Sequence, residues 1–351
     1  ILLSYDLSNV VVVYTTVAMG IKYTIVCLFL LPCLDFVVAQ ANHPWSSWTA
    51  LDDYVNRTDP NYAWNQVAEY RRERATVYCI NMTSQMWKDS SVHSQPLWWH
   101  QLIVAIPDNV QYFDSALVYI STGSNTDTDP PPETDWRVNA SAAFASEMRG
   151  VAAYLKQIPN QPIVFTADET QTRRWEDRII GWTWRRFVME ENGTDPEILL
   201  RMPMIKAVVR AFDTVASFTN QQDNRFNIDK FIPAGESKRG WTTWMVGAVD
   251  RRVVGIAPMV LSFMNFKPML QKYWRSLGGW TFAFNSYWRE GLTTQIGAPL
   301  MDRMADHIDP YSYRDRLNMP IFYMAAGGDE FFPPDDTNLF WDELKNPKMV
   351  T

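Results

Sequence analysis

The segment FIPAGESKRGWTTWMVGAVD, residues 231–250, places a serine between an apolar strand and an amphipathic helix. We expect the strand at 231–233 and the helix at 241–249, with Ser237 in the sharp turn between them. A nucleophilic serine needs such a turn, because it forces the hydroxyl out of the sheet, and small neighbours avoid clashes there. The segment therefore predicts a nucleophile elbow, with Ser237 as the nucleophile.

The sequence of this turn departs from the usual G-x-S-x-G motif. Gly235 stands two residues before the serine, but Arg239 takes the second position after it and Gly240 the third. The Lys238 N–H would donate to an oxyanion at the helix N-terminus, with support from the helix dipole. An N-cap role is the alternative for Ser237. The Lys238 and Arg239 side chains could favour an anionic substrate, or they could pair with nearby carboxylates, Glu236 or Asp250.

Two further turns follow apolar runs that we interpret as strands. Asp329 comes just after the run at 321–326, so it follows the serine in the chain order Ser, Asp/Glu, His, and it would orient a catalytic imidazole. Gly123 follows the run at 115–120, where the loop after the third strand of a hydrolase supplies the second oxyanion N–H. Ordinary polar turns are the alternatives at both places.

Strand-like and helix-like segments alternate along the chain, which predicts an α/β fold with a mainly parallel central sheet flanked by helices. An aromatic, helical insert at about 261–318 interrupts this alternation and would form a lid. We expect a single domain over 42–351, whose first part, to residue 75, wraps the core. The other expected strands lie at 75–80, 97–106, 163–165 and 253–258, and the other expected helices at 140–157, 176–187 and 204–218.

Composition and charge exclude several protein classes. The chain has 351 residues, of which 47% are hydrophobic and 14% aromatic, so it can build a sizeable core and is not a disordered chain. The net charge of -7 leaves no basic stripe for nucleic-acid phosphates. No His/Cys cluster has the spacing of a metal site and no phosphate-loop pattern occurs, so we expect neither metal nor cofactor.

The first 41 residues differ from the rest of the chain. After Met19, the basic Lys22 precedes an apolar run and a small-residue end at 39–41, which predicts a secretory signal peptide over 19–41. The apolar run is too short for a stable membrane span, although a membrane anchor remains the alternative. Residues 1–18 precede the candidate initiator methionine, and we expect them to be a non-native upstream extension.

Four N-x-S/T sequons also favour an exported, extracellular glycoprotein. They begin at Asn56, Asn81, Asn139 and Asn192. The part of the chain after the predicted signal peptide keeps a single cysteine, Cys79. It is expected to be either a buried thiol or one whose disulfide partner is missing.

Five segments together resemble one protein family. They are PNQPIVF (159–165), RWEDRIIGWTW (174–184), RMPMIKAVVRAFDTV (201–215), AGESKRGWTTW (234–244) and GGDEFFPPDD (327–336). These look like segments of the PhoPQ-activated pathogenicity-related proteins, a family that includes the autocrine proliferation repressor proteins of amoebae. The resemblance covers about residues 45–345. It implies an α/β-hydrolase fold, with Ser237 and Asp329 matching the family's predicted nucleophile and acid.

The triad that this fold requires lacks its histidine in the sequence. His43, His93, His100 and His307 all precede Asp329, whereas in this fold the catalytic histidine follows the acid, after the last strand. His307, in the insert, could enter the site only by an unusual chain order. After Asp329 we expect room for a helix near 339–344 but for no eighth strand. The sequence therefore predicts a truncated C-terminus, with the histidine beyond residue 351.

Two functions from different classes remain. The first is a secreted serine hydrolase, esterase or peptidase-like, that acts on a small-molecule or peptide acyl substrate through Ser237 and Asp329. The second is a catalytically inactive secreted signal of the autocrine repressor type that binds a cell-surface receptor. A histidine shortly after a further apolar strand would favour the enzyme.

Overall fold

The computed structural model describes residues 13–14, 24–25 and 47–351 of the chain. The chain divides into two compact units, residues 1–46 and residues 47–351. In the first unit, β1 (Val13–Tyr14) pairs with β2 (Thr24–Ile25) in antiparallel fashion. The predicted upstream extension and signal peptide otherwise lie outside the described residues.

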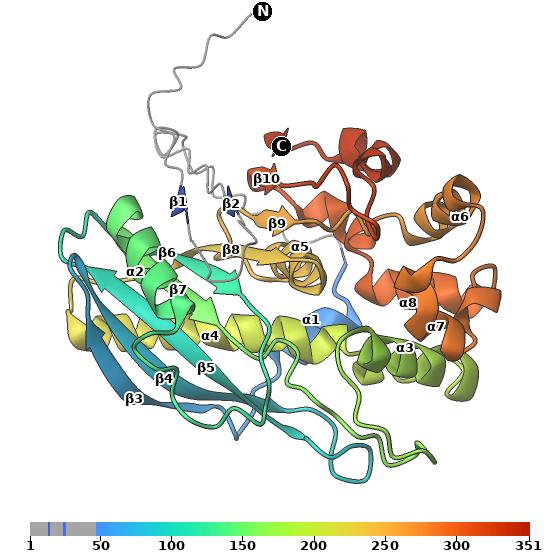
Figure 1. Cartoon of the computed structure of the whole chain (residues 1–351), viewed down its shortest axis with the longest axis horizontal. Coiled ribbons are helices and arrows are strands. Elements are labelled where there is room, and N and C mark those ends of the chain that lie inside the picture. The colour runs from blue at the N-terminus through green and yellow to red at the C-terminus, as the bar shows by residue number, and fades with distance from the viewer. Residues whose placement is uncertain (1–12, 15–23, 26–46) are drawn as a thin grey trace, which may run out of the picture. The chain divides into compact units, whose positions relative to one another are not determined.

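The second unit is built around a seven-stranded sheet in the order β3-β4-β5-β7-β6-β8-β9 (Figure 1). The pairs β3-β4, β4-β5 and β5-β7 are antiparallel, whereas β7-β6, β6-β8 and β8-β9 are parallel. The elbow serine therefore follows a strand in the parallel half. The strands are β3 (Ala63–Arg71), β4 (Ala75–Met86), β5 (Leu97–Pro107), β6 (Tyr112–Ile120), β7 (Gly150–Leu155), β8 (Lys230–Glu236) and β9 (Ala257–Met259).

Helices cover both faces of this sheet, as the α/β prediction requires. Figure 1 shows α2 on one face and α4 on the other, where α4 packs beside α5. The α/β class predicted from the alternation of strands and helices is therefore confirmed. The helices are α1 (Ala50–Asn56), α2 (Trp136–Met148), α3 (Asp177–Arg185), α4 (Arg201–Gln222), α5 (Lys238–Val249), α6 (Phe266–Leu277), α7 (Asn285–Arg289) and α8 (Pro299–Ile308).

The parallel half of the sheet continues beyond β9. Isolated bridges join Ile256 to Ile321 and Met259 to Met324, and these connect the β9 region to β10 (Ile321–Tyr323). A further strand, β11 (Lys348–Val350), pairs in parallel with β10. The expectation that no strand follows Asp329 was therefore wrong. Three residues are too short a run to show a strand pattern in the sequence.

Two other predicted elements need correction. The helix expected over 140–157 ends at Met148, Arg149 takes a left-handed conformation with φ 55°, and the buried strand β7 follows. A fully buried strand is a continuous apolar run, which periodicity alone cannot separate from a helix. The strand expected at 163–165 forms only isolated bridges. The expected N-terminal wrap contains α1 and the edge strand β3.

Cys79 lies in β4 with its residue 1% exposed, and burial raises the pKa of its thiol to about 11. It forms no disulfide within the described part of the chain. Of the two expectations for this cysteine, the buried thiol is the one that the structure supports. No helix among the described residues combines the length and the apolar character needed to cross a membrane.

Two buried histidines make the stability of this core depend on pH. His93 and His100 are 0% exposed, and burial lowers the pKa of each to about 4. The His100 Nε2 lies 2.9 Å from Ser84 Oγ, and its Nδ1 lies 3.2 Å from the Lys156 carbonyl oxygen. An unfolded histidine titrates at about 6.5, so the unfolded chain takes up protons first as the pH falls. The stability present at pH 7 is therefore lost between about pH 6.5 and pH 4.

We expect His100→Gln to weaken this pH dependence. Between pH 7 and pH 5, each buried histidine lowers the free energy of unfolding by about 2 kcal/mol, and the variant lacks one of these contributions. Urea unfolding of both proteins at the two pH values measures the difference. Burial raises the pKa of Asp309 to about 6, so this group also contributes to the pH dependence of the free energy of unfolding. Its contribution is the same in both proteins and cancels in the comparison. An identical pH dependence in the two proteins would contradict the prediction.

Candidate active site

Ser237 occupies the turn between β8 and α5 with φ 53° and ψ -122°. Its N–H donates to the Met259 carbonyl oxygen at 2.9 Å, and its own carbonyl accepts from the Trp241 N–H at 3.0 Å. A positive φ at a residue other than glycine is uncommon and persists where the surrounding structure enforces it, often at active sites. The Ser237 side chain makes no capping hydrogen bond to α5. The alternative role as an N-cap therefore lacks its defining contact.

The two elbow glycines allow the close approach of backbone that this turn requires. A Cβ at Gly235 would lie 2.9 Å from the Arg239 Cβ and from its carbonyl oxygen. A Cβ at Gly240 would lie 2.7 Å from the Met259 carbonyl oxygen, which belongs to the neighbouring strand. The glycine at the third position after the serine thus serves the packing of α5 against β9.

We expect Gly240→Ala to destabilise the protein by about 2 kcal/mol, because the added methyl group meets a backbone oxygen that cannot move aside alone. Thermal or urea unfolding measures the change. Gly297→Ala is the matched control, since a Cβ there would meet nothing within 4 Å. If the Gly240→Ala protein is as stable as the native protein, the elbow can accept a Cβ at this position without a clash, which would contradict the prediction.

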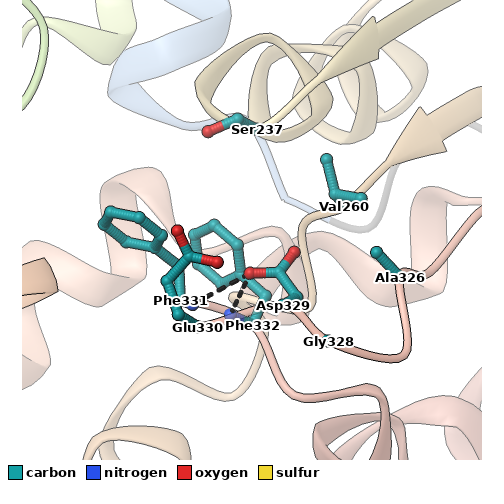
Figure 2. Close-up of a pocket in the computed structure, with 8 residues that line it drawn as sticks. All are labelled: Ser237, Val260, Ala326, Gly328, Asp329, Glu330, Phe331 and Phe332. Atoms are coloured by element: carbon teal, nitrogen blue, oxygen red, sulfur yellow. Dashed lines mark hydrogen bonds between the residues drawn. The ribbon is translucent and has the colours of Figure 1, made fainter. Parts of the chain in front are cut away.

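Ser237 and Asp329 line one cavity of about 460 Å³. Figure 2 shows the two side chains on opposite walls of the cavity, which brings together residues 92 positions apart in the sequence. This volume lies within the range of small-molecule sites. The other lining residues are Val260, Ala326, Gly328, Glu330, Phe331 and Phe332.

Asp329 is held by its own turn. Its Oδ1 accepts from the N–H groups of Phe331 and Phe332, each at 2.9 Å (Figure 2), and its N–H donates to the Ala326 carbonyl at 3.2 Å. These bonds satisfy one carboxylate oxygen and fix the orientation of the group beside the cavity. The turn role and the acid role predicted as alternatives are therefore compatible in this geometry.

Neither of the predicted oxyanion residues is among those that line the cavity. Lys238 begins α5, so its N–H is one of the first-turn amides that a helix cannot satisfy internally. Gly123 follows β6, which is the parallel neighbour of β8, with Ile120 opposite Gly235. The Gly123 loop and the elbow therefore leave the sheet at the same edge.

None of the histidines in the described ranges lines this cavity. His93 and His100 lie in the core, and His307 on α8 packs its ring against Phe187. His43 lies outside the described residues. Because β10 and β11 are parallel, the end of β11 at Val350 lies at the same sheet edge as the turn that carries Asp329.

Sequence reasoning missed Glu176, the residue before α3. Its carboxylate accepts from Thr122 Oγ1 at 3.0 Å, and the Arg239 Nη2 lies 2.6 Å from its Oε1. Pairing of Lys238 and Arg239 with Glu236 or Asp250, one of the two alternatives for these cations, is not what the structure shows. The Lys238 Nζ lies 2.9 Å from Asp177 and 3.7 Å from Glu176, and Arg239 pairs with Glu176. Both acids stand some 60 residues away from the elbow in the sequence, so local spacing offered no signal for the pairing.

The insert at 261–318 is tied to the segment that carries the acid. The Lys272 Nζ on α6 lies 2.9 Å from Asp335 and 2.5 Å from Asp336, which is 1% exposed. The Tyr273 hydroxyl donates to the Glu330 carbonyl at 3.2 Å. These contacts join α6, in the insert, to the segment that follows Asp329.

Comparisons with known proteins agree on the family and the fold. The model of the family described as PhoPQ-activated pathogenicity-related protein matches residues 51–351. Autocrine proliferation repressor protein A from Dictyostelium discoideum is 38% identical over 298 residues, which cover 84% of this chain and 58% of that relative. The chain therefore spans less than two thirds of the length of this relative.

Two solved structures share the fold at low sequence identity. An acetyl xylan esterase from Paenibacillus sp. R4 aligns with a TM-score of 0.57 and 14% identity, over 89% of this chain and 90% of that one. Acetyl xylan esterase 1 from Thermoanaerobacterium sp. JW/SL YS485 gives 0.53 and 13%, over 86% of each chain. Both neighbours are esterases, and the likeness establishes the fold as that of an α/β hydrolase.

Proposed function

Because the chain belongs to the PhoPQ-activated pathogenicity-related protein family and has the α/β-hydrolase fold, we propose that it is a secreted serine hydrolase that transfers acyl groups through Ser237. The observation that carries the proposal is the positive-φ elbow of Ser237, which lines one cavity together with Asp329. A positive φ at a residue other than glycine costs free energy, and such residues cluster at functional sites.

In the proposed reaction, the Ser237 hydroxyl oxygen attacks the carbonyl carbon of an ester or amide. A histidine beyond residue 351 takes the hydroxyl proton and later gives it to the leaving alcohol or amine. Asp329 orients that imidazole and stabilises its charged form. The N–H groups of Lys238 and Gly123 stabilise the oxyanion, and water then attacks the acyl-enzyme and releases the acid.

The position of β11 supports a histidine that follows it. The strand is parallel to β10, so a loop that leaves its C-terminal end begins at the edge of the sheet where Asp329 lies. The test is an assay of the natural chain extended past residue 351, with p-nitrophenyl acetate as a small acyl substrate. Turnover that depends on Ser237 supports the proposal, and a folded, extended chain that carries the histidine but does not turn over would refute it.

A second candidate is a catalytically inactive secreted signal that acts through a cell-surface receptor. The 38% identity to a protein named as an autocrine proliferation repressor favours it. The same assay separates the two functions. An extended chain that ignores every acyl substrate yet represses the proliferation of cells would establish the signal.

Secretion is part of both proposals. The asparagines of all four sequons, Asn56, Asn81, Asn139 and Asn192, are exposed, as glycosylation sites must be. We expect the chain expressed from Met19 in a secretory host to appear in the medium, with an N-terminus near Asn42. It should lose apparent mass on treatment with an N-glycosidase, which gel electrophoresis measures. Full-length protein retained in the cytosol would contradict the prediction.

A further inference from the structure

We propose that Glu176 is a positioning residue that sets the distance between the two halves of the oxyanion hole. The inference rests on the proposed function, since it assumes that the Gly123 and Lys238 N–H groups stabilise an oxyanion. These two groups come from different elements, the loop after β6 and the first turn of α5. Something must hold the two elements in register, because an oxyanion hole works only when both donors meet the same oxygen.

The Glu176 carboxylate contacts both elements. On the loop side, Thr122, the neighbour of Gly123, donates its hydroxyl to Glu176 Oε1 at 3.0 Å. On the helix side, Arg239, the neighbour of Lys238, donates Nη2 to Oε1 at 2.6 Å and Nη1 to Oε2 at 3.1 Å. One carboxylate therefore links the residues that adjoin the two proposed donors.

The backbone of Glu176 is itself fixed in an unusual conformation. Its φ of 49° and ψ of -123° nearly match the 53° and -122° of Ser237. Its N–H donates to Gln161 Oε1 at 2.8 Å, and the Gln161 amide donates in return to the Glu176 carboxylate at 2.8 Å. A non-glycine residue keeps such a conformation where its surroundings enforce it, and such residues cluster at functional sites.

The charge of Glu176 is needed for this arrangement. Burial alone would raise the pKa of its carboxyl group. The positive charges of Arg239 and Lys238, together with hydrogen bonds from Gln161 and Thr122, outweigh burial and hold the pKa below its usual range. Glu176 is the ion-pair partner of Arg239, whose residue is 6% exposed. Loss of the carboxylate would leave that guanidinium buried without a counter-charge, and the first turn of α5 would move to relieve it.

The test compares Glu176→Gln with the native protein, both as the full natural chain. Glutamine keeps the size of the side chain and an acceptor oxygen, but it removes the charge and one acceptor. We expect kcat to fall about 10- to 100-fold while KM changes less than about 3-fold, because the oxyanion forms only after substrate has bound. Affinity for a boronic acid, which forms a tetrahedral adduct with the serine, should fall with kcat.

Glu191→Gln is the matched control. The Glu191 carboxylate also pairs with an arginine, Arg186, at 2.7 Å, but it lies outside the proposed site, so kcat and boronate affinity should match the native values. If Glu176→Gln does not fold, Thr122→Val is the deciding variant. It removes the hydroxyl that donates to Glu176, and with it a long contact from Gln161 at 3.4 Å, but it leaves the pair of Glu176 and Arg239 in place. It should lower kcat by about 3- to 10-fold.

The possible outcomes separate this inference from the proposed function. If the native extended chain has no acyl-transfer activity, the hydrolase proposal itself fails. If the native chain is active but Glu176→Gln, or in its place Thr122→Val, keeps native kcat and boronate affinity, the hydrolase proposal stands and the positioning role of Glu176 is overturned. A rise in KM of about 10- to 100-fold with unchanged kcat also overturns the positioning role, because that pattern indicates that Glu176 contributes to substrate binding and not to stabilisation of the oxyanion.

Discussion

We expect Ser237→Ala to abolish the reaction of the extended natural chain with fluorophosphonate probes and with activated esters. The expectation follows from the proposed role of Ser237 as the nucleophile and from its place in a cavity that Asp329 also lines. Alanine has no hydroxyl, so no acyl-enzyme can form. Gel detection of a fluorescent fluorophosphonate, together with the rate of p-nitrophenyl acetate hydrolysis, measures the effect.

The 351-residue chain provides the complementary measurement. A serine hydroxyl is a weak nucleophile without a neighbouring base, and the described histidines do not line the cavity. This chain should therefore show little or no reaction with the same probes, even with Ser237 intact. If the extended Ser237→Ala protein reacts with the probes as fast as the native extended protein does, the nucleophile is another residue.

Asp329→Asn should lower the turnover of the extended chain by about 10³- to 10⁴-fold, by analogy with the acid of known triads. Asparagine can accept the same two N–H groups, from Phe331 and Phe332, so the turn should remain folded. What the variant loses is the negative charge that holds the imidazole in the correct tautomer and stabilises its charged form.

The kcat of the Asp329→Asn protein and its thermal unfolding together separate a catalytic role from a structural one. We expect the unfolding temperature to stay close to that of the native protein. Asp342→Asn is the control, because Asp342 is an exposed acid in the same C-terminal region and should leave turnover unchanged. Turnover within about 10-fold of native in Asp329→Asn would exclude this residue as the acid of a triad.

The sequence predicted the elbow because its signal is local. A strand, a serine with small neighbours and a helix follow one another within residues 231–250, and the structure has β8, Ser237 and α5 in that order. The α/β class followed from alternation along the chain in the same way. The Gly123 loop and the Asp329 turn were predicted as candidate site segments from their position after strands, and β6 and β10 do precede them.

The features that sequence reasoning missed depend on contacts between distant segments. β11 is three residues long, and it is a strand only because β10 lies beside it. β7 looked like the continuation of a helix because both faces of it are buried. The carboxylate that pairs with Arg239 lies 63 residues away, whereas the expected partners were neighbours in the chain.

The contacts of Lys272 and Tyr273 with residues 330–336 also couple the position of α6 to the turn that carries Asp329. Since α6 and that segment are joined, a displacement of α6 would be passed on to the Asp329 turn, which forms one wall of the cavity. The shape of the cavity would therefore depend on how α6 packs, although no residue of α6 lines the cavity itself.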